Sequence, residues 1–452
     1  MGLDFKIRDF AYPFAMFTLK RRFDADQWMN EDALVEYQLR RLTLIIEHAY
    51  RNVPYYKRVF DAKGILPGDI KSLEDLKILP FIGKEELRSN FRELTAKNAQ
   101  KFRPRLLSTS GTSGGAVQFL VDRPSNILEF VYYWRSWGWA GYRLGDTFAE
   151  LSAQFFTPFT AQQKKFFHCE ALTRRVMVNS LLISFENVGE YKEIFRWSRP
   201  KFLKGLPSNL YALACIFEKK PDHGVRFMAV FSQGENLLRH QREKIEKVFS
   251  TKVFDSYGHM ERTVAISQCP LGNYHVHEDY GIAEFVRPER AGLESATAGS
   301  SIREVAGTSL YNFAMPLLRY RTGDYVCMDT PPQRCPCNRG FPVIRSIIGR
   351  DADVIVTPDG RAITALYVAL DRTPHIRFGQ IIQERRDQLL VKVAYNVDDA
   401  RSCDSLLLKN IKDFTGDSLG IEILHVDPDM MEKGDAAKQK VIVSKCSNDF
   451  SG

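Results

Sequence analysis

The stretch 106–119, LLSTSGTSGGAVQF, concentrates small and hydroxyl-bearing residues ahead of a short apolar-alternating run. Small residues let backbone N–H groups converge on an anion, and hydroxyl groups add further donors, so this stretch could hold phosphate groups. The residues that would do so are Thr109, Ser110, Gly111, Thr112 and Ser113. A flexible hairpin connector has the same composition, because Gly and Ser also favour turns. Taken alone, the stretch favours the connector.

Two short segments, YGHME and YRTGD, each place a carboxylate close to a glycine. The carboxylates are Glu261 and Asp324, and a carboxylate can accept hydrogen bonds or bind a cation through its oxygen atoms. Each has a simpler structural interpretation. Tyr257-Gly258 is typical of a turn at a strand end, and Glu261 would then be a solvated residue in the first turn of a helix. Asp324 would lie in a surface turn.

Metal-ligating side chains occur in the segments SQCPLGNYHVH and RCPCNRG, whereas most of the eight cysteines are isolated. They make up the Cys₃His set that tetrahedral structural zinc takes: Cys269, His275, Cys335 and Cys337. His277 and Cys327 are reserve ligands. Cys-Pro-Cys is less diagnostic than a two-residue spacer, so ordinary reduced cysteines remain the alternative. Without a secretory pattern, the cysteines predict a reduced, cytoplasmic compartment.

The composition is that of an ordinary globular protein, with 44% hydrophobic and 26% charged residues. A chain of 452 residues is too long for one compact core, so at least two domains are expected. The net charge of +8 is spread along the chain, which favours an anionic small substrate and gives little support to nucleic-acid binding. The sequence has no apolar run of about 18 residues, so we predict no transmembrane helix.

Amphipathic spacing predicts a helix over 31–50, with Asn30 as its N-cap, within a helical part over 1–100. After this part, short β-rich runs alternate with amphipathic stretches. VRFMAVFSQGEN predicts a buried strand and a turn before a helix, KVFDSY the next strand, and GHMERTVAISQ a turn into the next helix. This alternation predicts an α/β architecture with ligands at the carboxyl ends of the strands, where Gly234 and Glu235 lie.

After Gly349 the pattern changes to that of a small α+β module. DVIVTPDGRAIT predicts a hairpin with Asp359-Gly360 at its tip, and FGQIIQER and QLLVKVAYN predict two strands. A helix, SCDSLLLKNIKDFTG, and a strand, GIEILHVD, complete the pattern. We therefore expect a large domain over 1–348 and a small domain over 349–452.

Four separated segments share one explanation: the loop at 108–115, YGHME at 257–261, YRTGD at 320–324 and GRDAD at 349–353. In this order they resemble the adenylate-forming superfamily of acyl-CoA synthetases and ligases. Within it, the chain is most similar to the phenylacetate-CoA ligase and CapK-like capsular-polysaccharide group. NVPYY, LPFIGKEELRSNF, LKGLPSNLYALA and FGQIIQE extend this resemblance over nearly the whole chain. It implies a large α/β domain of several subdomains followed by a small, mobile α+β domain.

The resemblance implies where ATP would bind. The loop at 108–115 would hold the β- and γ-phosphates, which now favours the phosphate interpretation of that stretch. Tyr257 would stack near the adenine, with Gly258 beside it, and Glu261 would help to hold Mg²⁺. Asp324 would accept hydrogen bonds from the ribose hydroxyl groups.

The resemblance also implies how the two domains would cooperate. Arg350 would join Asp324 at the ribose, and Asp351 would be the hinge about which the small module rotates between adenylation and transfer. That module would deliver Lys438, in EKGDAAKQKVIVSK, to the α-phosphate, where its ammonium group offsets negative charge in the transition state. Lys440 matches a later basic residue of the family. The alternative makes Lys438 a solvated lysine of the tail.

For other residues near these segments we expect a structural role and not a catalytic one. His259 is not needed as a general base, because the attacking carboxylate is already ionised at neutral pH, so we expect it to line the pocket. Tyr133, Trp134 and Trp137 belong to an aromatic stretch whose default role is core packing, and some of them could shape an acid pocket.

The leading hypothesis is an AMP-forming ligase that activates a carboxylic acid with ATP and passes the acyl group to a thiol such as CoA. A CapK-like enzyme with an amine or sugar acceptor is the first alternative. A degenerate nucleotide-binding protein is the second, because three positions depart from the family pattern: Val117, Met260 and Ala437. The expected ligands are ATP, Mg²⁺, a small carboxylic acid and a thiol or amine acceptor, with CoA and structural zinc as further candidates. A homodimer is a further candidate partner state.

Overall fold

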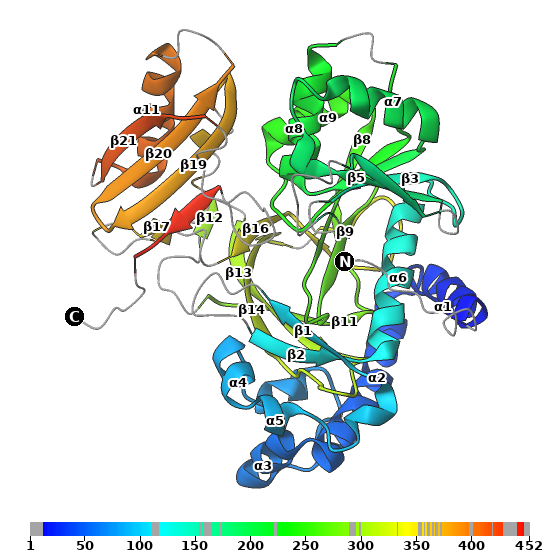
Figure 1. The fold of residues 1–452 in the computed structure, drawn as a ribbon. Coiled ribbons are helices and arrows are strands. Elements are labelled where there is room, and N and C mark those ends of the chain that lie inside the picture. Colours follow the sequence, from blue (N-terminus) through cyan, green and yellow to red (C-terminus); the bar gives the residue numbers. More distant parts are fainter. Residues whose placement is uncertain are drawn as a thin grey trace.

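A computed structural model of the chain has separate helical, parallel-sheet and antiparallel-sheet parts, and it confirms the mixed α/β character of the predicted fold (Figure 1). The structure describes residues 12–109, 117–152, 156, 165–170, 174–220, 224–288, 295–297, 300–331, 333–350, 355–356, 358, 362–363, 366, 369–370, 373–396, 401–417, 419–427 and 441–446. Across these residues, none of the helices combines the length and the apolar character that a membrane span requires.

The N-terminal part is helical, as its amphipathic spacing predicts. Its helices are α1 (Tyr12–Asp26), α2 (Glu31–Asn52), α3 (Pro54–Lys63), α4 (Lys84–Ser89) and α5 (Phe91–Leu94), with short 3-10 turns at Pro67–Asp69, Glu74–Ile78 and Ala99–Phe102. Asn30 caps α2, since its side chain accepts a hydrogen bond from the Ala33 N–H at 2.9 Å. The apolar face of α2 is buried in a core that also contains Val117 and Tyr320.

The small-residue loop joins two paired strands, β1 (Arg105–Thr109) and β2 (Val117–Val121), which form a two-stranded antiparallel sheet. Thr109 lies opposite Val117 in this register, so residues 110–116 connect the strands of a hairpin. These connecting residues lie outside the described part of the chain. A hairpin connection leaves the phosphate role open, because phosphate-binding loops also connect ordered elements.

The central sheet has nine strands in the order β15-β10-β9-β8-β7-β6-β3-β5-β4. Their bounds are β3 (Phe148–Ser152), β4 (Phe167–Glu170), β5 (Arg175–Asn179), β6 (Phe202–Gly205), β7 (Ala229–Gln233), β8 (Lys252–Gly258), β9 (Ala265–Gln268), β10 (Tyr274–Val276) and β15 (Val343–Ile344). The strands β5, β3, β6, β7 and β8 are parallel, and the flanking pairings are antiparallel. The alternation predicted from the sequence therefore forms a mainly parallel core, as β–α–β connections require.

Helices pack on both faces of this sheet. One face is covered by α7 (Val188–Ser198), α8 (Pro207–Glu218) and α9 (Arg239–Phe249). The other face packs against α6 (Arg123–Gly138), whose Trp137 contacts a cluster with Phe148, Phe202 and Phe231. Phe148, Phe202 and Phe231 come from β3, β6 and β7, so α6 lies over the parallel part of the sheet.

The segment GHMERTVAISQ corrects one expectation. We expect a helix after its turn, but residues 265–268 form β9, antiparallel to β8. The strand aligns Ser267 with Ser256 and Ile266 with Tyr257. Pairing with β8 and the burial of all four residues of β9 outweigh a local pattern that fits either element.

A five-stranded antiparallel sheet follows, in the order β11-β13-β14-β16 with β12 paired to β13. Its strands are β11 (Gly281–Val286), β12 (Ser295–Thr297), β13 (Ser300–Ser309), β14 (Tyr320–Asp329) and β16 (Ser346–Arg350). The last strand runs across residue 348, where the sequence pattern changes. The division of the chain at that residue stays a prediction.

The C-terminal module, at the upper left of Figure 1, contains the elements expected from its sequence. The strands β17 (Ile355–Val356) and β18 (Ala362–Ile363) form an antiparallel pair. A four-stranded sheet has the order β21-β20-β19-β22. Its strands and the accompanying helix are β19 (Ile376–Arg385), β20 (Gln388–Tyr395), α11 (Arg401–Thr415), β21 (Gly420–His425) and β22 (Ile442–Ser444). The Tyr211 hydroxyl on α8 donates to the Ile376 carbonyl oxygen at 3.4 Å and so joins this module to the central sheet.

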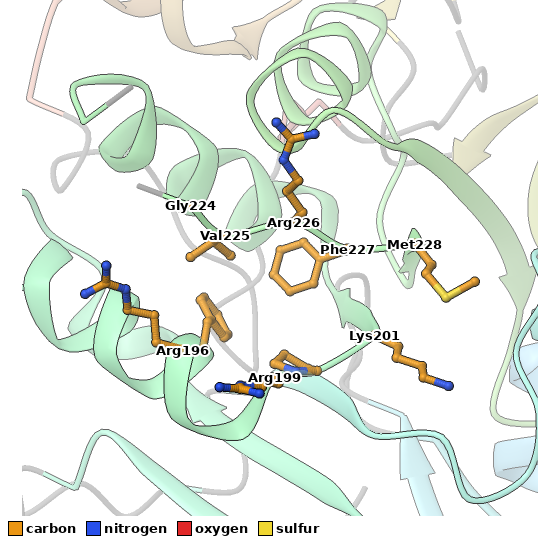
Figure 2. A pocket seen from close by; sticks show the side chains of 10 residues that line it. Arg196, Arg199, Lys201, Gly224, Val225, Arg226, Phe227 and Met228 are labelled. Carbon is orange, nitrogen blue, oxygen red and sulfur yellow. The ribbon is translucent and has the colours of Figure 1, made fainter. Parts of the chain in front are cut away.

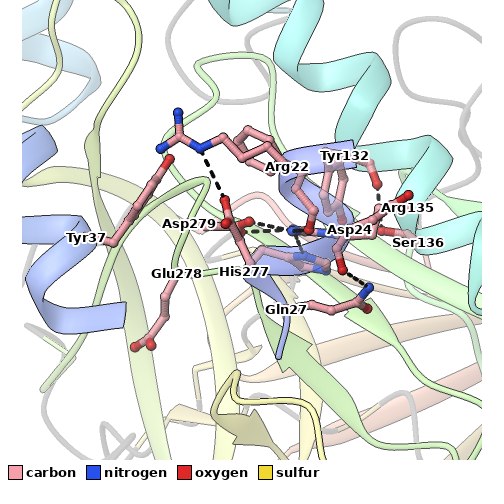
Figure 3. Close-up of polar contacts among 12 residues, drawn as sticks. Arg22, Asp24, Gln27, Tyr37, Tyr132, Arg135, Ser136, His277, Glu278 and Asp279 are labelled. Atoms are coloured by element: carbon pink, nitrogen blue, oxygen red, sulfur yellow. Dashed lines mark hydrogen bonds and ion pairs between the residues drawn. The ribbon is translucent and has the colours of Figure 1, made fainter. Parts of the chain in front are cut away.

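Helix α6 is tied to the N-terminal helix and to the segment between β10 and β11 by a buried arginine (Figure 3). Arg135 donates to the Phe23 carbonyl oxygen at 2.8 Å, forms an ion pair with Asp279, and donates to Nδ1 of His277. Both charged side chains of the ion pair are fully buried. Removing one partner would leave an uncompensated buried charge, at a cost of about 3–5 kcal/mol.

Glu278, next to this ion pair, predicts how stability depends on pH. Burial raises the pKa of Glu278 to about 7, and the negative charges of Glu31 and Asp279 add to the shift. An unfolded chain would release the same proton near pH 4.3. The folded state therefore binds the extra proton between these values, and its stability falls as the pH rises towards 7. Glu278→Gln should raise the free energy of unfolding by about 1–3 kcal/mol at pH 8 and change it little at pH 4.5.

Urea unfolding at the two pH values measures this effect. Glu36→Gln is the control, because Glu36 lies on the surface of α2 with 70% of its side chain exposed. A stabilisation by Glu278→Gln that is equal at both pH values would show that the carboxyl group does not titrate in this range.

Candidate active site

The YGHME segment begins at the carboxyl end of β8 and turns back into β9, at the edge where α/β sheets bind ligands. The Tyr257 hydroxyl donates to Oδ2 of Asp324 at 2.7 Å. These two residues are 67 positions apart in the sequence. The structure therefore brings together two residues that the resemblance assigns to nucleotide binding.

Glu261 is buried, with 5% of its surface exposed. Its Oε1 accepts a hydrogen bond from the Tyr320 hydroxyl at 2.8 Å, and its Oε2 lies 3.1 Å from Nδ1 of His259. Burial alone would raise the pKa of Glu261, but its interactions with His259 and Tyr320 outweigh burial and lower the pKa to about 2. The interpretation as a solvated helix residue is therefore wrong. The ionised carboxylate keeps lone pairs that fit a Mg²⁺ ion.

His259 orients this carboxylate. The Val264 N–H donates to Nε2 of His259 at 3.2 Å, so Nε2 is an acceptor and the ring proton lies on Nδ1, facing Glu261. The Thr263 hydroxyl also contacts Nε2, at 3.1 Å. Because a backbone N–H occupies its lone pair, His259 cannot serve as a general base in this arrangement. This geometry agrees with the expected lining role.

The YRTGD segment opens β14 and contains a local irregularity. Gly323 has a φ of 71°, in the left-handed region that favours glycine. The following Asp324 is buried, and its N–H donates to Oγ1 of Thr322 at 3.0 Å. In the pairing of β14 with β16, Asp324 lies opposite Arg350. The backbone therefore places both predicted ribose-binding residues at one position of the antiparallel sheet.

Gly234 and Glu235 follow β7, one strand away from Tyr257. Gly234 has a φ of 84°, so the turn itself requires a glycine. Oε2 of Glu235 accepts a hydrogen bond from the Ser208 N–H at 3.1 Å, in the first turn of α8. Glu235 thus stabilises the start of a helix that packs on the sheet.

Several predicted residues cannot be placed. Those outside the described residues are Ser110, Gly111, Thr112, Ser113, Asp351, Ala437, Lys438 and Lys440. The strand positions of Thr109 and Arg350 are described, and their side chains are not.

Burial explains why valine, and not the lysine of the family pattern, occupies position 117. Another lysine, Lys84, lies elsewhere in the site. Val117 is 1% exposed and belongs to the core under β2, so a charged side chain would be costly there. Nζ of Lys84 lies 3.8 Å from the place that a Cβ atom on Gly323 would occupy. The segment before α4 forms an isolated bridge between Ile82 and Tyr320, which holds Lys84 beside YRTGD. Lys84 lies within LPFIGKEELRSNF, but no pattern in the sequence singles this lysine out.

The four predicted zinc ligands meet at one place. Their ligand atoms all lie within 4.8 Å of one another: Cys269, His275, Cys335 and Cys337. The two sulfur atoms of Cys269 and Cys335 are 3.7 Å apart, and the Cys337 sulfur is 3.3 Å from Nε2 of His275. Zn–S bonds of about 2.3 Å at tetrahedral angles place two sulfur atoms about 3.8 Å apart. The donor set and its spacing therefore fit zinc.

The surroundings also suit a metal site. Nδ1 of His275 lies 3.1 Å from the Phe341 carbonyl oxygen, an acceptor that leaves Nε2 as the ligand atom. The Asn273 amide donates to the Cys335 sulfur at 3.2 Å. The two reserve ligands lie elsewhere: His277 contacts Arg135, and Cys327 packs in a small cluster with Ile348.

A cavity of about 670 Å³ lies at the opposite end of the parallel strands (Figure 2). Lys201 and Met228, which line it, directly precede β6 and β7. Its other cationic side chains are Arg196, Arg199 and Arg226. Since α/β sheets bind nucleotides at the carboxyl ends of the strands, this cavity is separate from the candidate active site.

The chain is similar in sequence to several bacterial proteins. It is 27% identical over 349 residues to the phenylacetate-coenzyme A ligase of Pseudomonas putida, covering 74% of each chain. It is 22% identical over 377 residues to protein CapK of Staphylococcus aureus, covering 81% of this chain and 79% of that protein. No protein-family model matches the chain.

The fold is similar to that of a solved ligase. 2-Hydroxyisobutyryl-CoA ligase in the postadenylation state has a TM-score of 0.70 at 17% identity, covering 93% of this chain and 91% of that chain. The same ligase in the thioesterification state, in complex with 2-HIB-AMP and CoA, has a TM-score of 0.57 at 19% identity over the same shares. The chain is therefore a distant homologue of the phenylacetate-CoA ligases and of CapK, and it has the fold of a solved CoA ligase.

Proposed function

We propose that the protein activates a carboxylic acid with ATP and transfers the acyl group to the thiol of CoA. In the first step, a carboxylate oxygen attacks the α-phosphorus of ATP and pyrophosphate leaves. In the second step, the CoA sulfur attacks the acyl carbonyl carbon and AMP leaves. The observation that best supports this proposal is the hydrogen bond between Tyr257 and Asp324, with Glu261 buried in the same YGHME segment. The homology to phenylacetate-CoA ligases supports it as well.

The nucleotide would bind across the edge formed by β7, β8 and β14. Asp324 and Arg350 would hold the ribose, Tyr257 the adenine, and the loop that starts at Thr109 the terminal phosphates. Val117 stands where the family pattern has a lysine, and it cannot neutralise phosphate charge. Lys84 would do so instead, because its ammonium group lies near Gly323. A lysine in this place would supply the point charge that phosphate binding uses.

Glu261 would hold Mg²⁺ together with phosphate oxygens. When bound, the ion would neutralise charge on the phosphate chain as pyrophosphate leaves. His259 would keep the carboxylate ionised and oriented through its Nδ1–H bond. Lys438 would approach the reacting carboxylate from the C-terminal module, which would turn about Asp351 between the two steps.

The cluster of Cys269, His275, Cys335 and Cys337 would hold a structural zinc ion. Four protein ligands close the coordination shell, which is typical of structural and not catalytic zinc. The ion would join the end of β9 and β10 to the loop before β15, and so fasten one side of the sheet that carries YGHME.

A second candidate function differs only in the acceptor. The similarity to CapK extends over 81% of the chain, a larger share than for the phenylacetate-CoA ligase of P. putida. An amine or sugar would then replace CoA, with the same adenylation step. Measuring pyrophosphate release for a panel of acids tests adenylation, and product formation with and without CoA separates the two acceptors. Acid-independent ATP turnover, or none at all, would contradict both candidates.

The ribose-binding role of Asp324 predicts a loss of nucleotide affinity. Asp324→Ala would remove a buried carboxylate, and each charge-assisted hydrogen bond contributes about 1.5–3 kcal/mol. We expect the Kd for ATP to rise by about tenfold to a hundredfold, as measured by calorimetry. Asp329→Ala, further along β14, is the control. Unchanged affinity in the Asp324 variant would remove the ribose-anchor role.

A further inference from the structure

A lysine and a glutamate face α6 from the middle of the parallel sheet. Lys204 on β6 and Glu150 on β3 are paired in the strand register, and their Nζ and Oε1 atoms are 3.3 Å apart. The other oxygen of Glu150 lies 2.7 Å from Arg175 on β5. Lys204 and Glu150 each keep 13% of their side-chain surface exposed, so solvent reaches both of them between interior strands.

Two cations, Lys204 and Arg175, balance two carboxylates in this cluster, but Lys204 has more hydrogen-bond donors than the cluster uses. Burial raises the pKa of Glu150, yet Lys204 and Arg175 outweigh that effect and lower it, so the carboxylate is ionised. Glu170 lies 3.9 Å from the other side of Arg175. Among the described residues, Glu150 is the single hydrogen-bond partner of the Lys204 ammonium group, which has three N–H donors.

Aromatic rings lie beneath that ammonium group. Nζ of Lys204 is 5.3 Å from the ring centre of Trp137 and 5.7 Å from that of Tyr133. The two rings stack with their centres 5.6 Å apart. Tyr133, Trp134 and Phe254 are only partly buried, whereas Trp137 is buried and stacks with both Tyr133 and Phe231. The sheet and α6 thus leave aromatic surface accessible beside a cation.

This aromatic surface is continuous with the candidate active site. The Tyr133 hydroxyl lies 3.8 Å from the place that a Cβ atom on Gly258 would occupy. Gly258 directly follows Tyr257, whose hydroxyl binds Asp324. A row of side chains therefore runs from YGHME, along Tyr133 and Trp137, to Lys204.

We propose, on the basis of the proposed function, that the partly buried rings of this cluster, Tyr133 foremost, receive the organic part of the acid and that Lys204 donates a hydrogen bond to an oxygen at its far end. The substrate class is then an aryl acid that carries a hydroxyl, carbonyl or second carboxylate group remote from the reacting carboxylate. A flat ring packs against the accessible part of Tyr133, and the remote oxygen takes a donor of Lys204 that is otherwise unused. An unsubstituted acid would displace water from the ammonium group without replacing its hydrogen bonds, and so would bind less well.

Pyrophosphate release from matched acids tests this specificity. The probes are phenylacetic, 4-hydroxyphenylacetic and 4-carboxyphenylacetic acid, compared by kcat/KM. The wild-type protein should prefer an oxygenated acid to phenylacetic acid by about tenfold to a hundredfold. Lys204→Met keeps the length of the side chain and should abolish the preference, mainly by lowering kcat/KM for the oxygenated acids. Lys201→Met is the matched control, because Lys201 is 55% exposed and pairs with Asp146 just before β6.

The outcomes separate this inference from the function it rests on. If none of these three acids releases pyrophosphate but another acid of the panel does, only the inference about the substrate class fails. If no acid of the panel releases pyrophosphate, the proposed function fails and this inference fails with it. If acids are activated without a preference for the oxygenated ones, only the inference about Lys204 is overturned. An equal loss for all three acids in Lys204→Met would likewise overturn it, since that result indicates a structural ion pair. Should Lys204→Met fold poorly, the double variant Lys204→Met/Glu150→Gln removes both charges and so leaves no unpaired carboxylate. The ratio of kcat/KM between oxygenated acids and phenylacetic acid in the wild-type protein still tests the inference.

Discussion

Lys438→Ala should lower the rate of acyl-adenylate formation by about two to three orders of magnitude, because its ammonium group would offset charge on the α-phosphate in the transition state. ATP affinity should barely change, since the large domain would supply most contacts to the nucleotide. Transfer from a preformed acyl-adenylate to the acceptor should survive, because that step would use the other orientation of the C-terminal module. Acid-dependent pyrophosphate release, calorimetry with ATP and single-turnover transfer measure the three effects.

Lys440→Ala is the control for this experiment and should have a milder effect. If Lys440 proves to be the sensitive residue, the match to the catalytic segment is displaced by two positions. If neither variant changes the rate of an active protein, the segment 431–444 does not carry the catalytic lysine.

Cys335→Ser should remove a bound zinc ion and destabilise the protein by about 4 kcal/mol or more. The cause is that the metal binds the folded arrangement of its four ligands, so its binding free energy is part of the folding free energy. Elemental analysis of wild-type protein purified without added metal should find close to one zinc per chain. Thermal unfolding of the variant should begin at a lower temperature.

Cys169→Ser is the matched control, because Cys169 is exposed on the edge strand β4 and lies apart from the cluster. It should leave both the zinc content and the unfolding temperature unchanged. A metal-free wild-type protein that is as stable as Cys335→Ser would make the four residues an ordinary group of reduced thiols and a histidine.

Elements with a strong local period could be predicted from the sequence. The helix α2 follows from its apolar spacing and from Asn30 at its start. The strand β20 follows from its alternating pattern and β19 from a short apolar run, and both strands pack on one core. In these segments the local preference and the final burial agree, so no distant partner is needed to decide between helix and strand.

The strand β9 could not be predicted, because TVAISQ fits a helix start or a strand equally well. Its pairing with β8, which sets Ser267 opposite Ser256, decides the outcome. The role of His259 is likewise decided by tertiary contacts. The residue type allows a base or a structural ligand, and only the Val264 N–H on Nε2 assigns the ring proton to the side of Glu261.

The sequence by itself determined which chemistry the chain can carry: a small-residue loop, two turn carboxylates, a Cys₃His set and the order of motifs shared with adenylate-forming ligases. Residue type and spacing are enough for that inference, because each ligand requires particular donor atoms. Only the tertiary structure decided which of these groups meet. Cys269 and Cys335 are 66 positions apart, and the placement of Lys84 beside Gly323 and of Lys204 beside Trp137 depends on contacts between distant segments. Strand pairing and burial set such contacts over the whole chain, and no local pattern records them.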